Sequence, residues 1–349
     1  MCLAVFSFCP QRDAALVVYE TRDQSIHLPH GRPAAAGFGI DTASYACHWR
    51  DNPQLLDRVW TFRIGHDRDL LAEPIIGGLD AGGGTWMAVN QRTGVYARIL
   101  IAPMASGELG ESASDELRAR RASLGYVTRS GLCLDAVSYP SAAAAAKGLQ
   151  TDLPAALDRD RKLMLPLFLL LADASDAYVV RLHEDGRVEV TPITDCGTHV
   201  LTVRGLDTPA AALSQILLDR LAEQPRPDTD PASWDGWLSA FAIDGRISDD
   251  DYRDPSWRAH RSTALQPPYL NTLGQTRHQR APWPSQADAG EVEWTKSTTC
   301  VVIGQDGLRT FLYEERHVTP GQPWPQTISA AAFPASSADY TLVTELAAR

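Results

Sequence analysis

The sequence predicts an α+β protein in which antiparallel strands form a layered sandwich, and three observations support this class. Short apolar runs typical of strands cluster near both ends of the chain. Turn-prone segments join successive runs into hairpins, whereas helical patterns lie between the two clusters. Strands that are neighbours in sequence, with the helices grouped apart from them, favour layered sheets over a doubly wound βαβ fold.

The first two pairs of strands are hairpins. The runs CLAVFSF (2–8) and AALVVYE (14–20) are strand-like, and the stretch PQRD between them is turn-prone. The runs TWMAVN (85–90) and VYARILIA (95–102) form a second pair across the turn QRTG. The glycines just before TWMAVN are expected to form a tight turn, because no nucleotide-binding context surrounds them.

The later elements follow in order. LFLLLAD, AYVVRLH and VEVTPI are expected to form a meander over 167–193, with the turn HEDGR before the last strand. The run TTCVVIGQDGLRTFLYEER (298–316) predicts a hairpin around QDG, and YTLVTEL (340–346) predicts one last strand. Helical patterns lie at 111–124, 141–150 and 209–223.

We interpret the chain as a single domain covering residues 1–349. With 349 residues, of which 44% are hydrophobic, it has ample material for a core. The segment from about 224 to 290 is irregular and rich in Pro, Asp, Trp and Arg. We expect this segment to be an insertion with a little helix in it, not a second domain.

The charge balance argues against a nucleic-acid partner. The net charge is −11, and phosphate binding needs a concentrated basic surface. The stretch ELRARRASLGYVTR (116–129) is a local exception. An exposed helix and turn is the favoured interpretation of this stretch, and an anion-binding patch is the alternative.

Neither a secretory signal nor a membrane span is expected. The apolar run 3–8 is too short for a signal and has no basic residue before it. The longest apolar stretch, LMLPLFLLLA (163–172), is about half of the roughly 20 residues that a membrane helix needs, so we expect a strand buried on both faces.

The cysteines favour a reducing, cytoplasmic location. They are scattered, with no CxxC pair and no zinc-like spacing. The six are Cys2, Cys9, Cys47, Cys133, Cys196 and Cys300. His27 and His30 are near each other in HLPH, but no third ligand is close in sequence, so neither a metal nor a cofactor is expected.

Cys2 is the first candidate for chemistry. A buried strand cysteine is one interpretation. The other is that removal of Met1 gives Cys2 a free α-amine, with a pKa of about 7.7–8.0 that suits a base at neutral pH. Nucleophile and base then belong to one residue. Such a site needs a cation to favour the thiolate and a carboxylate to orient the amine, and Arg22 and Asp23 at the end of the paired strand are candidates. A strand-end salt bridge is the alternative for these two.

These residues, with further motifs, resemble the NRDE family, which includes homologues of the transport and Golgi organisation protein 2. The resemblance rests on MC at the start, RDQ with Pro29 after it, GGTWMAVN (83–90) with Gly94, and the late hairpin ending in Glu315 and Arg316. It is recognisable to about residue 135 and again at 295–316, which is roughly half the chain.

The resemblance implies the four-layer αββα sandwich of N-terminal nucleophile hydrolases. It extends more distantly to bile-salt hydrolases and penicillin V acylases. Carried over by motif position, Cys2 would be nucleophile and base, Arg22 would support the thiolate, Asp23 would hold the α-amine, and Asn90 would donate to the oxyanion. Trp86, Thr202 and Lys296 are the substrate-binding candidates, although Trp86 also fits a core position.

Three departures from the family pattern weaken the implied site. The motif N-R-D-E reads Thr21-Arg22-Asp23-Gln24, so its first and last positions differ. A later L-S-N or L-T-N element becomes Leu201-Thr202-Val203, and valine cannot donate a side-chain hydrogen bond. A T-R pair becomes Thr295-Lys296, which keeps the charge but loses the bidentate fork. Losing one oxyanion donor typically slows a reaction by ~10²–10³.

Two functions therefore follow as expectations. The first is an N-terminal cysteine hydrolase or acyltransferase, acting as an amidase or thioesterase on a small acyl compound. The second is a non-catalytic carrier of acyl-CoA, lipid or haem, as family members are associated with such ligands and a fold does not fix a function. A tailoring enzyme of a specialised pathway is a third interpretation, for which no residue names a substrate.

Overall fold

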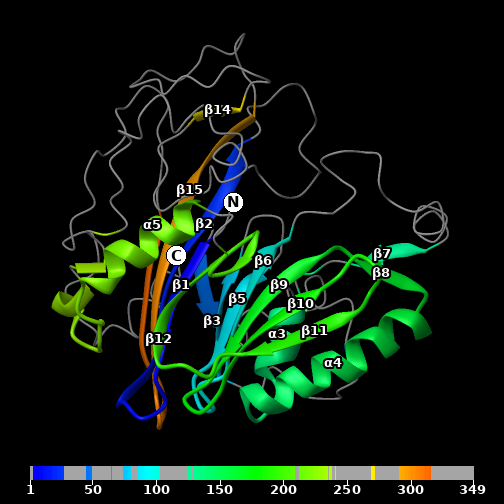
Figure 1. Ribbon diagram of the computed structural model, residues 1–349. Helices are drawn as coiled ribbons and strands as arrows, with labels where there is room; N and C mark the ends of the chain where they lie inside the picture. The colour runs from blue at the N-terminus through cyan, green and yellow to red at the C-terminus, as the bar shows by residue number, and fades with distance from the viewer. Residues whose placement is uncertain are drawn as a thin grey trace.

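The computed structural model has two packed antiparallel sheets with helices on their outer faces (Figure 1). All structural statements concern the residues that it describes. These are 3–26, 45–48, 64, 74–79, 85–102, 124–127, 129, 131–208, 212–234, 236–237, 240, 269–271 and 291–315.

Sheet A contains the N-terminal strand near its centre. Within the described residues it has seven strands in the order β13-β12-β1-β2-β15-β14, and β16 also pairs with β15. All of these pairs are antiparallel. The strands are β1 (Leu3–Phe8), β2 (Ala14–Ile26), β12 (Gly197–Thr202), β13 (Gly205–Leu206), β14 (Tyr269–Asn271), β15 (Glu291–Gly304) and β16 (Gly307–Glu315).

Sheet B is formed by the middle of the chain. Its seven strands among the described residues have the order β11-β10-β9-β6-β5-β4-β3. They are β3 (Tyr45–His48), β4 (Ile75–Leu79), β5 (Thr85–Asn90), β6 (Tyr96–Ile101), β9 (Leu167–Ala172), β10 (Ala177–Leu182) and β11 (Val188–Pro192). A short parallel pair, β7 (Gly125–Val127) and β8 (Lys162–Met164), lies apart from both sheets.

The helices pack on the outer faces of the two sheets (Figure 1). On sheet A, Leu217 and Leu221 of α5 join the apolar cluster that includes Val5. On sheet B, the outer face is covered by helices α3 and α4. The helices are α3 (Leu132–Val137), α4 (Ala142–Arg159), α5 (Ala212–Ala222) and the 3-10 turn η3 (Pro231–Trp234). None of the described helices is long and apolar enough to cross a membrane.

Burial on both faces explains why polar residues do not alternate with apolar ones along strand β1. Successive strand residues point to opposite faces of a sheet, and both faces of this one are covered. Leu3 and Val5 pack in the cluster beneath α5, whereas Ala4, Phe6 and Phe8 pack between the sheets. All six residues of the strand are buried.

Within the described residues, the structure confirms the predicted hairpins at 3–20, 85–102 and 298–315 and the meander of β9, β10 and β11. The stretch LFLLLA is a fully buried strand, as expected. Helix α4 is longer than predicted, because it continues across Pro154 to Arg159. The predicted helix at 111–124 lies outside the described residues except for its last residue, and the predicted strand at 340–346 lies wholly outside them.

The first part of the predicted insertion belongs to the core around sheet A. Trp234 and Trp237 are buried in the cluster beneath α5, with their rings edge to face. Arg226 donates hydrogen bonds to Ser7 Oγ and to the carbonyl oxygens of Ser7 and Ala15. Burial lowers the pKa of Arg226 to about 10. Residues 224–234 therefore pack against β1 and β2, and most of the rest of 224–290 lies outside the described residues.

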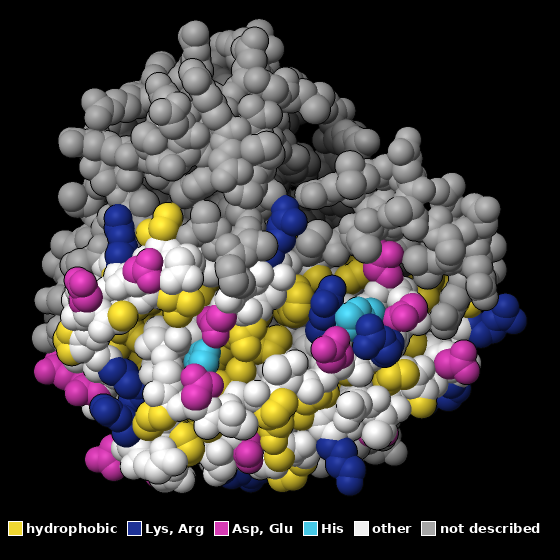
Figure 2. All heavy atoms as spheres, viewed as in Figure 1, with side chains coloured by type: hydrophobic (Ala, Val, Ile, Leu, Met, Phe, Trp, Pro, Cys, Tyr) yellow, Lys and Arg dark blue, Asp and Glu magenta, His cyan; other side chains and the backbone are white. Residues whose placement is uncertain are grey.

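Charged side chains are mixed over the described part of the face shown in Figure 2. Lys and Arg side chains lie among Asp and Glu side chains there and do not gather into a basic patch. The stretch 116–129, with its four arginines, lies largely outside the described residues. The alternative of an anion-binding patch there stays a prediction.

Candidate functional site

The candidate site lies at the end of sheet A where β1 begins. Leu3, which follows Cys2 directly, pairs with Thr21, which precedes Arg22 directly. The same Thr21 pairs on its other side with Thr298 of β15. Backbone pairing therefore brings the start of β1 beside the part of β2 that carries Arg22 and Asp23. Cys2 and the side chains of Arg22 and Asp23 lie outside the described residues.

A β-bulge places Lys296 at the same end of the sheet. Thr295 pairs with Asp23 and Ser297 pairs with Arg22, so Lys296 is an extra residue between two consecutive positions of β2. Bulges of this kind bend a strand and change the direction of a side chain, and they are frequent next to active sites. The register therefore brings Lys296 beside Arg22 and Asp23, although its side chain is outside the described part.

Thr202 lies on the other side of β1, at the same end. Leu201 pairs with Ala4, so Thr202 is the next residue of β12 toward the start of β1. Its hydroxyl accepts a hydrogen bond from the backbone N–H of Arg204 and lies 3.4 Å from the carbonyl oxygen of Gly205. Thr202, the last residue of β12, and Val203, which begins the turn to β13, are both buried. The structure thus brings four of the predicted positions, Arg22, Asp23, Thr202 and Lys296, to one end of sheet A.

Trp86 packs in the core between the two sheets. Its side chain is 6% exposed and belongs to the apolar cluster that separates sheet A from sheet B. The ring lies directly against Gly78, where an added Cβ would be 2.3 Å from Trp86 Cζ2. A larger residue at position 78 would displace the ring. The core interpretation of Trp86 therefore fits its surroundings.

Asn90 lies at the opposite end of the strands, so its predicted oxyanion role is not supported. The backbone carbonyl of its neighbour Gln91 accepts a hydrogen bond from Leu308 N, beside the β15–β16 turn. Leu308 pairs with Ile303, which pairs with Leu16, and Leu16 pairs with Phe8, the last residue of β1. This series of pairs places Asn90 near the end of β1, whereas Cys2 precedes its start.

The Asn90 side chain also has a structural use of its own. Its Nδ2 donates to the carbonyl oxygen of Val137 at the end of α3, and its Oδ1 accepts from the N–H groups of Arg92 and Thr93. Asn90 therefore caps the β5–β6 turn and ties it to α3. The GGTWMAVN run predicted the strand correctly, but the two ends of that strand lie at opposite ends of the sheets.

Sequence reasoning missed a buried polar cluster next to the candidate site. Glu20, Tyr96 and Arg98 are each at most 1% exposed and lie between the sheets. Glu20 Oε2 accepts a 2.6 Å hydrogen bond from Tyr96 Oη and is 3.0 Å from Arg98 Nε. Burial and the Glu20 carboxylate raise the pKa of Tyr96, so the phenol stays protonated. The sequence contains a sign of this cluster, because the apolar run 14–20 includes one charged residue, Glu20, and the apolar run 95–102 includes one, Arg98.

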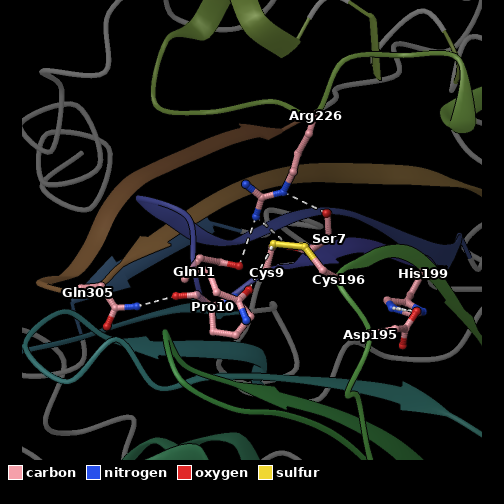
Figure 3. The surroundings of a disulfide bond; sticks show 10 residues. Ser7, Cys9, Pro10, Gln11, Asp195, Cys196, His199, Arg226 and Gln305 are labelled. Atoms are coloured by element: carbon pink, nitrogen blue, oxygen red, sulfur yellow. Dashed lines mark hydrogen bonds and ion pairs between the residues drawn. A yellow bond between two sulfur atoms is a disulfide. The ribbon is translucent and has the colours of Figure 1, made fainter.

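A disulfide joins the other end of β1 to β12. Cys9 follows β1 directly, Cys196 precedes β12 directly, and their Cα atoms are 4.6 Å apart (Figure 3). Phe8 pairs with Gly197, so the bond closes the end of an existing strand pair. The scattered spacing of the cysteines did not predict this bond, because 187 residues separate the two partners. Cys133 and Cys300 are buried thiols.

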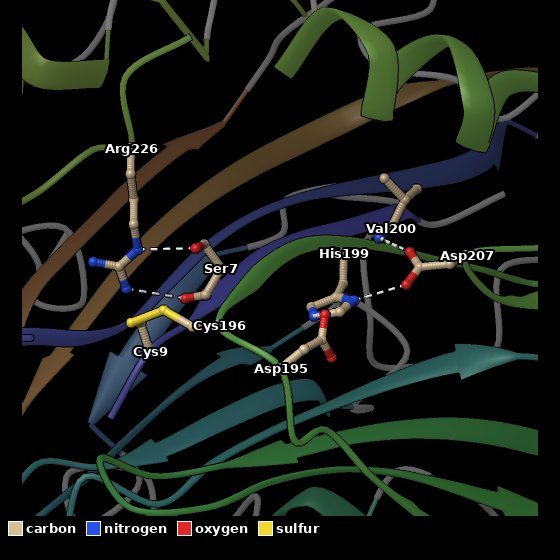
Figure 4. A network of polar contacts seen from close by, with 8 residues as sticks. All are labelled: Ser7, Cys9, Asp195, Cys196, His199, Val200, Asp207 and Arg226. Atoms are coloured by element: carbon tan, nitrogen blue, oxygen red, sulfur yellow. Dashed lines mark hydrogen bonds and ion pairs between the residues drawn. A yellow bond between two sulfur atoms is a disulfide. The ribbon is translucent and has the colours of Figure 1, made fainter. Parts of the chain in front are cut away.

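A histidine flanked by two carboxylates lies close to the disulfide (Figure 4). His199 Nδ1 is 2.7 Å from Asp207 Oδ2, and Nε2 is 3.5 Å from Asp195 Oδ2. Asp207 also accepts from Val200 N, and the His199 ring packs on Phe6. Asp207 has a φ of 44°, a left-handed conformation that these hydrogen bonds hold. Through these contacts Asp207, the residue after β13, is linked to His199 and Val200 of β12.

Comparison with known proteins adds no assignment. Neither the models of known protein families nor the curated proteins match this sequence. Among the described residues, no group of three or more His, Cys, Asp or Glu side chains could hold a metal ion.

Proposed function

We propose that the chain is an N-terminal cysteine hydrolase or acyltransferase that acts on a small amide or thioester. The observation that carries the proposal is the pairing of Leu3 with Thr21. This pair puts the residue after Cys2 opposite the residue before Arg22, in rigid central strands. Catalytic groups held on such elements keep their geometry better than groups on loops.

The proposed reaction uses the two functional groups of Cys2. After removal of Met1, the α-amine takes the thiol proton while Sγ attacks the substrate carbonyl carbon. The tetrahedral intermediate collapses as the amine gives the proton to the leaving nitrogen or sulfur, which leaves a thioester on Cys2. Water or an acceptor amine then attacks this thioester and regenerates the thiol. Arg22 would stabilise the thiolate, and Asp23 would orient the α-ammonium.

Lys296 and Thr202 are proposed to surround the substrate. The bulge at Lys296 sets a cationic residue beside Arg22, which suits a substrate with a carboxylate or phosphate group. Thr202 follows Leu201 at the same end of the neighbouring strand β12. We further propose that the two sheets and their outer helices form the αββα sandwich of N-terminal nucleophile hydrolases. The helix packing supports this proposal, because α5 packs on the outer face of sheet A, and α3 and α4 pack on the outer face of sheet B.

A specific observation favours the alternative, a non-catalytic carrier of acyl-CoA, lipid or haem. Neither of the positions expected to bind an oxyanion offers a side-chain donor to the site. The Asn90 amide donates to Val137 O at the opposite end of the strands, and position 203 is an apolar valine. Loss of one such donor typically slows the reaction by ~10²–10³, so turnover would be slow and binding would dominate.

The two functions are separated by acyl transfer to Cys2. The protein is incubated with p-nitrophenyl acetate and with a panel of amide and thioester donors, and peptides are analysed by mass spectrometry. An acyl adduct confined to Cys2, and absent from a Cys2→Ser variant, is expected for the enzyme. If no donor gives an adduct and the Cys2→Ser variant binds ligand like the wild type, the carrier function replaces it.

A cytoplasmic location is retained only as a proposal. The scattered spacing of the cysteines predicts a reducing compartment, whereas the Cys9–Cys196 disulfide is typical of oxidising compartments. The redox state of this bond in the native protein tests the location directly.

A further inference from the structure

The cluster of Glu20, Tyr96 and Arg98 crosses the apolar layer between the two sheets. Glu20 is on β2 of sheet A, whereas Tyr96 and Arg98 are two residues apart on β6 of sheet B. Around them the layer consists of apolar side chains such as Leu100 and Leu170. Glu20 pairs across the ladder with Ala4, two residues after Cys2. The cluster therefore connects the sheets at the level of the candidate site.

The stability of the fold does not explain this cluster. Removing two charges from water is costly, and apolar residues of similar size often serve equally well or better. The cluster is also incomplete as a stabilising unit. Glu20 Oε1 is buried and accepts no hydrogen bond from the described part of the chain. A partly satisfied buried network contributes little net stability, so another role has to be considered.

The contacts of Arg98 point to that role. Its Nη2 donates a 2.8 Å hydrogen bond to the carbonyl oxygen of Thr21. Its Nη1 lies 3.5 Å from the carbonyl oxygen of Trp86 on β5. One guanidinium, held by Glu20, thus connects the residue before Arg22 to a strand of the other sheet. The planar fork of arginine suits such a multiple contact.

We infer that Glu20 and Arg98 are positioning residues that hold the Arg22–Asp23 segment of β2 beside the start of β1. This inference rests on the proposed function of Cys2. Tyr96 fixes the carboxylate of Glu20 through its 2.6 Å hydrogen bond, and Glu20 in turn orients Arg98. Small displacements of catalytic groups can slow a reaction by about 10²-fold, so a segment carrying two of them needs such support.

The test compares Cys2 reactivity between matched variants. The rate of Cys2 alkylation by iodoacetamide is measured by mass spectrometry from about pH 5 to pH 10, together with Cys2 acylation by p-nitrophenyl acetate. The main variant combines Glu20→Gln with Arg98→Met, which removes both charges and leaves neither buried alone. Leu100→Ala is the control, because Leu100 is on the same strand and in the same layer but outside the cluster.

The double variant is expected to remain folded while Cys2 acylation falls about tenfold and the alkylation midpoint moves to higher pH. Arg98→Lys keeps the charge but loses the planar fork that contacts Glu20 and Thr21 O together, so it should retain part of the rate. Leu100→Ala should lower the thermal midpoint but leave Cys2 acylation within about twofold of the wild type, because a cavity there moves no catalytic group. Tyr96→Phe loses a single donor and should give a smaller change in the same direction.

Each outcome has a distinct meaning. A double variant with wild-type acylation and an unshifted alkylation midpoint overturns this inference and leaves the proposed function intact. A wild-type Cys2 that accepts no acyl group overturns the proposed function, and the inference falls with it. If the double variant does not fold, Tyr96→Phe decides, because an unchanged Cys2 in that variant also contradicts the inference.

Discussion

Leu3 lies opposite Thr21 in the β1–β2 ladder, and Arg98 of the second sheet donates a hydrogen bond to the carbonyl oxygen of that same Thr21. Thr21 also pairs with Thr298 of β15, so position 21 is held by both neighbouring strands and by the facing sheet. The two residues that flank this pair, Cys2 and Arg22, are the proposed nucleophile and its cation. This backbone pair sets the start of β1 beside the Arg22–Asp23 segment of β2.

Replacing Asn90 with alanine is expected to destabilise the protein without affecting Cys2. The variant loses one hydrogen bond to Val137 O and two from the turn N–H groups, which are buried or partly buried. Unsatisfied buried groups of this kind cost about 1–3 kcal/mol each, so unfolding in urea should begin at lower concentration. Cys2 acylation should be unchanged. A large loss of acylation in a folded Asn90→Ala variant would restore its predicted catalytic role.

Breaking the Cys9–Cys196 disulfide is expected to lower the free energy of unfolding by about 2–5 kcal/mol. The bond closes a long loop, because its partners are 187 residues apart, so it restricts the unfolded chain strongly. Urea unfolding with and without dithiothreitol measures the effect. A variant with Cys9→Ala and Cys196→Ala is the control and should not respond to the reductant. Identical wild-type curves in both conditions would show that the bond does not form.

Stability should fall above about pH 9 because of Cys133. Burial is the main cause that raises the pKa of this thiol well above its usual value of 9.0. The unfolded chain releases the proton near that value, whereas the native protein keeps it. The contribution is therefore present below the unfolded pKa and is lost as the pH rises above it, by about 1.4 kcal/mol per pH unit.

Cys133→Ala checks this assignment. The variant should lose a constant amount of stability near neutral pH because of the smaller side chain. Above about pH 9 its unfolding free energy should decline less steeply than that of the wild type. Parallel curves for the two proteins over the alkaline range would contradict the assignment of the slope to Cys133.

Local signals predicted much of the fold. Turn sequences such as QRTG and QDG separate strand-like runs, and the structure pairs those runs as expected. The helical pattern predicted at 141–150 covers only the first part of α4, which continues across Pro154 to Arg159. Proline has no backbone N–H, so the helix lacks the hydrogen bond from position 154 to the carbonyl oxygen of Gln150. Gln150 is exposed, so water can satisfy that oxygen and the helix continues.

The parts of the site that could not be predicted depend on contacts between distant segments. Pairing of Arg98 with Glu20 joins two sheets, and no local pattern specifies which buried charges meet. Cys9 and Cys196 likewise meet only because β1 pairs with β12. The position of Asn90, away from the start of β1, could not be predicted for the same reason. A motif gives the order of residues along a strand but not which end of that strand faces the site.

The measurement that tests the central proposal most directly is the intact mass of the natively expressed protein, before and after brief treatment with iodoacetamide. The proposal predicts loss of Met1 and fast addition of one group, mapped to Cys2, while the buried thiols of Cys133 and Cys300 react only after unfolding. Retention of Met1, or a Cys2 that reacts no faster than the other cysteines, would contradict a free N-terminal nucleophile. The carrier function would then be the one to pursue.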